Sequence, residues 1–260
     1  MSRGRIDAQI TVPTGGWSVS VAITAIGGSP FTVTIAAGTY YPVDLLSTFQ
    51  TQLDAASGAD GAFTVSASWG EAGTGFVTIA HATQTITVTW TSTALRDVLG
   101  FTGTLTPAAL TFTGTEACEA VWLPNAEAAF YYGNGDEGHT ETDASSTISP
   151  RGDVKRLVYN TRQVLPSATW SHVQKAFARA AAETTTNASF ERWWRNTQGG
   201  ELSYFEPAAP VRLVWNADSP STYKTYRLPG LTSTEMTRVV DEWNGLFRIE
   251  IPRLVRVPGT

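Results

Sequence analysis

Apolar and polar residues alternate along much of the first hundred positions, and this period predicts half-buried β-strands. The alternation is clearest at residues 17–23 and 31–35, which flank the turn sequence Gly27-Gly28-Ser29-Pro30. Two such runs joined by a Gly/Pro turn predict a β-hairpin. Further runs with the same period lie at residues 63–69, 75–80 and 85–90. The pattern therefore predicts a mainly β, antiparallel first module.

Two segments of this module have the three-to-four spacing of an amphipathic helix instead. Residues 43–53 carry apolar side chains at this spacing, and Pro42 suits the first turn of a helix. Residues 92–100 repeat the pattern over a shorter length. The hydroxyl of Ser92 is the expected N-terminal cap and Gly100 the expected stop. We therefore expect two short helices within the first module.

The second half of the chain has a weaker pattern. Short helices are predicted at residues 173–183 and 189–194. Residues 236–243 and 246–257 predict a C-terminal hairpin across Asn244-Gly245, a sequence typical of tight hairpin turns. A helix over residues 233–243 is the alternative, and the clean alternation after the turn favours the strand. Further strands are expected at residues 155–159, 201–205, 211–215 and 223–228.

Charge divides the chain into an acidic and a basic half. Residues 1–150 contain three basic and thirteen acidic residues, whereas residues 151–260 contain fifteen basic and ten acidic ones. This split has two explanations. It is either a compositional bias of the protein's family without a role, or opposite charges on the two halves orient copies head to tail in an assembly. We expect two domains, an acidic β-rich module at 1–117 and a β-sandwich domain at 118–260. The second has an exposed loop near 133–150, for which a hairpin with a mobile tip is the alternative.

Candidate chemistry is sparse. Three histidines lie in unrelated contexts, and the carboxylate pair Glu116/Glu119 has no recognisable catalytic setting. The acidic loop at 134–143 could hold Ca²⁺, but a solvated turn is favoured because the loop lacks calcium-loop spacing. The single cysteine, Cys118, is expected to be a buried thiol. We expect no catalytic, cofactor-binding or metal-binding residues, no specific nucleic-acid binding and no membrane insertion.

Aromatic side chains of the second half are the remaining candidates for a site. Exposed rings stack on sugars, but two adjacent tryptophans on one short helix cannot face the same way. We therefore favour a role in the core or in subunit contacts. The candidate interface residues are Trp193, Trp194, Tyr204, Phe205, Trp243 and Phe247.

Two stretches resemble virion proteins of tailed bacteriophages. In the first, Ile35-Ala-Ala-Gly-Thr-Tyr40, a helix around Leu45–Leu53 and the closing Leu99-Gly100-Phe101 resemble a module that recurs in viral structural proteins. Ala37 stands where that module often has proline. The likeness covers about a quarter of the chain.

The second stretch resembles minor tail proteins of the distal-tail type. It comprises Phe190-Glu-Arg-Trp-Trp194, Gly199-Gly200, Leu202-Ser-Tyr-Phe-Glu-Pro207, Tyr223-Lys-Thr-Tyr-Arg-Leu228 and the last hairpin. The resemblance implies a tail-tube-like β-sandwich in the second half and a hexameric ring around a channel.

The sequence thus predicts a mainly β protein of antiparallel sandwich domains with a few short helices. We expect a non-enzymatic structural component of the virion, assembled in the host cytoplasm, that forms a homo-oligomeric ring with other tail proteins as partners. The alternatives are a carbohydrate-binding module for host attachment and a capsid decoration or neck protein. A tail-associated hydrolase fits least, because no base can be paired with a nucleophile.

Overall fold

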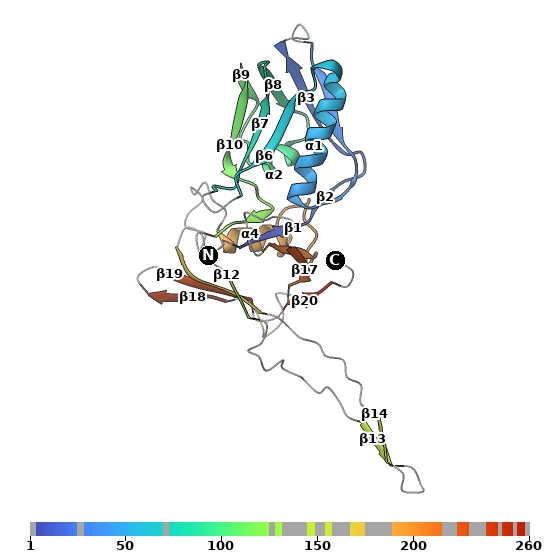
Figure 1. The fold of residues 1–260 in the computed structure, drawn as a ribbon, viewed down its shortest axis with the longest axis vertical. Helices are drawn as coiled ribbons and strands as arrows, with labels where there is room; N and C mark the ends of the chain where they lie inside the picture. Colours follow the sequence, from blue (N-terminus) through green and yellow to red (C-terminus); the bar gives the residue numbers. More distant parts are fainter. Residues whose placement is uncertain are drawn as a thin grey trace.

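The computed structural model confirms a mainly β protein made of several antiparallel sheets and a few short helices (Figure 1). The structure describes residues 4–24, 29–69, 73–124, 128–131, 145–148, 154–157, 167–174, 189–214, 223–228, 238–243, 246–251 and 254–257. No helix in these ranges is both long enough and apolar enough to cross a membrane.

Two sheets that share one apolar core build most of the first module. The first has the order β4(Phe31–Ile35), β3(Trp17–Ile23), β8(Ile86–Trp90), β9(Leu105–Ala109). The second has the order β10(Thr111–Ala117), β7(Phe76–His81), β6(Phe63–Ala67). Strict alternation of buried and half-buried residues along β3 produces the predicted β3–β4 hairpin.

Helix α1(Pro42–Ser57) packs against β4 and β6, one edge strand of each sheet (Figure 1). It starts with Pro42 and buries Leu45, Leu46, Phe49 and Leu53, as their spacing predicts. The turn η2(Gly58–Asp60) follows it. Helix α2(Thr93–Val98) also forms, but the Ser92 hydroxyl does not cap it. Instead, Ser92 Oγ accepts a hydrogen bond from the Ser18 N–H (2.9 Å), so it joins the helix start to β3.

A five-stranded sheet connects the two halves of the chain. Its order is β11(Val121–Trp122), β1(Arg5–Ala8), β16(Val211–Val214), β17(Tyr223–Arg227), β20(Val255–Arg256). Strand β1 comes from the N-terminus, yet it pairs with β11 on one side and with β16 on the other. The next strand, β2(Ile10–Val12), pairs with β5(Gly38–Tyr40) of the first module. Strand β1 thus lies within the module expected at 1–117, whereas its partners β11 and β16 belong to the domain expected at 118–260.

The second half also contains a four-stranded sheet and a separate hairpin. The sheet has the order β12(Ala128–Tyr131), β15(Ser167–Gln174), β19(Leu246–Ile251), β18(Arg238–Trp243). Strands β13(Ser145–Ile148) and β14(Val154–Leu157) pair with each other. Helix α4(Phe190–Thr197) forms where it is predicted, and the Ser189 side chain caps it by accepting the Arg192 N–H.

Four predictions for the second half need correction. Residues 201–205 form turns rather than a strand. The Phe205 N–H donates to the Leu202 carbonyl (3.1 Å), so the chain turns here, and this turn buries both Tyr204 and Phe205. Val173 and Gln174 belong to β15, not to a helix, and residues 175–183 lie outside the described residues.

The other two corrections concern the hairpins. The C-terminal hairpin exists as β18 and β19, but its second strand ends at Ile251, just before Pro252, which cannot donate to a ladder. Residues 255–256 join the five-stranded sheet instead. Within the loop expected at 133–150, residues 145–148 form β13 of a hairpin, in agreement with the alternative, and the rest lies outside the described residues.

Candidate functional site

The two halves of the chain meet where the five-stranded sheet and α4 contact the first module, a region called the joint below. The joint contains most of the buried polar side chains of the described residues. Arg5 and Asp7 lie two residues apart on β1, so both side chains face the same side of the strand. Arg5 Nε donates to Asp7 Oδ1 (2.8 Å) and Arg5 Nη2 to Asp7 Oδ2 (3.1 Å). Each residue is only 1% exposed, and the guanidinium lies 4.5 Å from the centre of the Trp69 ring. Burial raises the pKa of Asp7, and the neighbouring Arg5 guanidinium opposes that rise.

Arg212 forms the first side-chain link between the halves. Its guanidinium lies between the rings of Tyr41 and Tyr223, 3.8 Å and 4.2 Å from their centres. Arg212 Nη1 donates to Asp44 Oδ2 at the start of α1 (2.8 Å). Gln9 Nε2, which lies between β1 and β2, donates to the Tyr41 hydroxyl (3.0 Å). A cation on the five-stranded sheet is thereby held to the first turn of a helix in the first module.

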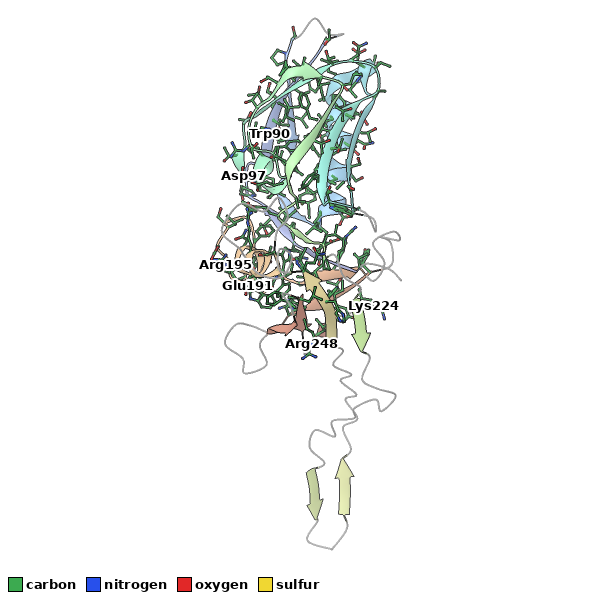
Figure 2. All side chains as sticks on the ribbon, turned by 90° about the vertical axis from the view of Figure 1, so that its left-hand side faces the viewer. Trp90, Asp97, Glu191, Arg195, Lys224 and Arg248 are labelled. Atoms are coloured by element: carbon green, nitrogen blue, oxygen red, sulfur yellow. The ribbon has the colours of Figure 1, made fainter. Side chains whose placement is uncertain are left out.

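Arg192 of α4 forms the second link. Its Nη2 lies 3.2 Å from Glu119 Oε1 and 3.6 Å from Glu116 Oε2. The Tyr204 hydroxyl donates to the other oxygen of Glu119. One cation and one phenol of the second half therefore converge on two carboxylates at the end of β10 and just after it. Figure 2 shows Glu191 and Arg195, the neighbours of Arg192 on α4, in the middle of the body, below Asp97 of the first module and above Arg248 of β19.

These links are ion pairs between the acidic and the basic half of the same chain. Arg192 and Arg212 of the basic half pair with Asp44, Glu116 and Glu119 of the acidic half. Opposite charge across the sequence thus holds the two halves of a single copy together. Those three carboxylates already have partners before any second copy arrives.

The candidate interface residues are mostly interior. Trp193, Trp194, Tyr204, Phe205 and Phe247 are all at most 9% exposed, and Trp193 Nε1 donates to the Ala120 carbonyl (3.3 Å). Within one copy these five rings lie in the core, and little of their surface is left for a partner subunit or a sugar to contact. The side chain of Trp243 lies outside the described residues.

Aromatic packing explains this burial. Trp122 of β11 makes edge contacts with Trp170 and Phe190, at 5.0 Å and 4.9 Å between ring centres. Tyr204 contacts Trp17 of β3 in the same way at 5.9 Å. Edge-to-face pairs of this kind stabilise a core beyond their buried area. These contacts hold α4 to β11 and the 201–205 turn to β3 of the first module.

The other candidates have structural settings. His81 is buried; its Nε2 donates to the Asp60 carbonyl (2.8 Å) and its Nδ1 accepts the Gln84 N–H (3.0 Å), which confirms its role in a turn. His172 is exposed on β15, and His139 lies outside the described residues. Cys118 is buried as expected, and burial raises the pKa of its thiol to about 12. Among the described residues, no group of three His, Cys, Asp or Glu side chains is placed to hold a metal ion.

Sequence reasoning missed the residues that form the joint. The signal was present: Arg5 and Asp7 are charged residues at one face of an apolar strand, and Arg212 interrupts the apolar run Val211-Arg-Leu-Val214. A charge within a buried strand indicates a partner, because an unpaired buried charge is costly. The acids that pair with Arg192 and Arg212, in contrast, lie more than seventy residues away along the chain.

Comparison of the chain with protein-family models, with curated proteins and with solved structures found no match. The functional argument therefore depends on the residues and the fold alone.

The joint predicts a specific pH dependence. Burial raises the pKa of Glu119, although Tyr204 and Arg192 lower it in part, and Asp97 and Glu116 raise it further. A raised pKa in the folded state means that Glu119 stabilises the fold below its unfolded pKa. This contribution is lost as the pH rises through the folded pKa. We expect Glu119→Gln to gain stability relative to the parent as the pH is raised from about 4.5 towards 7.5.

Urea unfolding of parent and variant across this pH range tests the prediction. Asp7 titrates in the same direction, but its contribution is common to both proteins and cancels in the difference. If the two stability curves run parallel, Glu119 is not the group responsible.

Proposed function

We propose that this chain is a structural subunit of a tailed-bacteriophage particle, in the tail or tail tip, that assembles into a ring of identical copies without catalysing a reaction. The proposal starts from the likeness of residues 35–101 and 190–228 to phage virion proteins. It is supported by how the described strands of the second half are arranged.

The hairpin β13–β14 is the observation that carries the proposal. Both views place it at the far lower end of the molecule, away from the sheets and helices of the body (Figures 1 and 2). Its two strands pair with each other in a single register from Ser145–Leu157 to Ile148–Val154. A two-stranded hairpin is marginally stable alone in water. A partner that packs against it is therefore the natural source of its stability, and a neighbouring copy in a ring supplies one.

The four-stranded sheet supports the same conclusion. Its outer strands are β12 and β18, and within the described residues no further strand pairs with either. An open edge presents unpaired N–H and C=O groups to another chain. Two different edges on one copy allow head-to-tail contacts, which close into a ring when the rotation permits.

The test is the solution mass of the full chain together with negative-stain images. We expect ring-shaped oligomers, and we expect replacement of residues 145–157 by a short Gly/Ser linker to reduce them to smaller species. The melting temperature of the body should stay the same, because both views set the hairpin apart from the core. Gln52→Met, on the exposed side of α1, is the matched control and should assemble like the parent.

A chain that is strictly monomeric at every concentration contradicts the ring. A monomer that binds glycans supports the carbohydrate-binding alternative instead.

A further inference from the structure

Strand β6 lies at the edge of its sheet, yet two of its outward N–H groups are already bonded. Among the described strands, the order β10, β7, β6 leaves one side of β6 without a neighbour. On that side the Phe63 N–H donates to Asp54 Oδ1 (2.8 Å) and the Val65 N–H donates to Gln50 Oε1 (3.0 Å). Both acceptors belong to α1. Side chains of a helix thus take the place that a further strand would occupy.

The spacing of the two elements explains why this works. Residues two apart on a strand are about 6.7 Å apart along its axis. Residues four apart on a helix are about 6 Å apart and lie on the same face. Gln50 and Asp54 therefore match Phe63 and Val65 in spacing. Leu46, Phe49 and Leu53 are buried on α1 and hold this face of the helix against the sheet.

We propose that Gln50 and Asp54 form an edge guard, a pair of side chains that occupies the N–H groups of β6 and prevents a strand of a second copy from pairing there. An unprotected edge strand pairs readily with another chain, and proteins commonly block such edges. The surface concerned is the outer edge of β6, and the partner that the guard excludes is another copy of this chain.

Other edges of the first module are closed by different means. Strand β9 contains Pro107, which has no N–H to donate. The N–H groups of Thr115 and Glu116 on β10 donate to the Gly100 carbonyl (3.0 Å and 3.1 Å). The outer strands β12 and β18 of the four-stranded sheet pair with no further strand among the described residues. The edge guard thus directs copies to join through the second half, a consequence that rests on the proposed function.

The test removes the acceptors and keeps the size of the side chains. In Gln50→Met/Asp54→Leu, the amide hydrogens of Phe63 and Val65 should exchange about tenfold faster, because each loses a hydrogen bond. Sedimentation at increasing concentration should then show association beyond any that the parent shows. Gln50→Glu/Asp54→Asn retains an oxygen acceptor at both positions and should behave like the parent in both measurements.

The control variant is Ser47→Leu/Gln52→Met, which adds the same two apolar side chains on the exposed side of α1. It should leave both amides protected and should associate no more than the parent does. If the acceptor-free variant exchanges faster but sediments like the parent, the pair only holds α1 to β6, and the guard is refuted. Equal association in the control also refutes it. If the parent forms no ring, the proposed function fails, whereas the guard is still judged by the association that the variant gains.

Discussion

Replacement of Asp7 by alanine is expected to lower the free energy of unfolding by about 3–5 kcal/mol. The substitution leaves the guanidinium of Arg5 buried at 1% exposure without its carboxylate partner. Within the described residues the other groups near Arg5 offer no charge in its place, because Trp69 contributes only the face of its ring. Denaturation of parent and variant in urea at neutral pH gives the difference directly.

The control is the double variant Arg5→Met/Asp7→Leu. A buried ion pair replaced by apolar residues of similar size often costs little, because the desolvation penalty disappears with the charges. We expect the double variant to recover most of the stability that Asp7→Ala loses. If it is as unstable as the single variant, the loss comes from altered packing of β1 and not from an unpaired charge.

Gly100→Ala is expected to lower the free energy of unfolding by about 3 kcal/mol. Gly100 has a φ of +76°, and a Cβ added there would lie 2.1 Å from the Glu116 carbonyl oxygen. That oxygen belongs to the backbone, so the chain itself must move. The Glu116 side chain contacts Arg192, and the Glu116 N–H donates to the Gly100 carbonyl. A shift of Glu116 therefore loosens the joint as well.

Gly103→Ala is the matched control for this prediction. A Cβ at Gly103 would have no atom within 4 Å, so we expect a change within about 0.5 kcal/mol. The two variants are three residues apart and are compared by thermal or urea unfolding. The comparison separates the effect of the contact with the Glu116 carbonyl from the effect of replacing a glycine as such. Equal losses in both variants would contradict it.

Local pattern was enough to predict most of the first module. The alternation in residues 17–35 and the helical spacing in 42–57 each describe an element whose burial depends on near neighbours, and both formed as expected. The candidate site was not predictable in this way. Tyr204 and Phe205 follow an apolar-aromatic pattern that suits a strand, but both are buried from a turn. Helix α4 was predicted, whereas the contacts of its Arg192 with Glu116 and Glu119 were not.

The sequence by itself determined a mainly β architecture, two helices in the first module, the C-terminal hairpin and the uneven distribution of charge. Only the tertiary structure decided where β1 belongs, because a four-residue strand carries no record of its partners, and its neighbours β11 and β16 are more than a hundred residues away. The tertiary structure also decided which acids meet Arg192 and Arg212. Local period reflects which side of an element is buried, but the identity of its neighbours depends on the path of the whole chain.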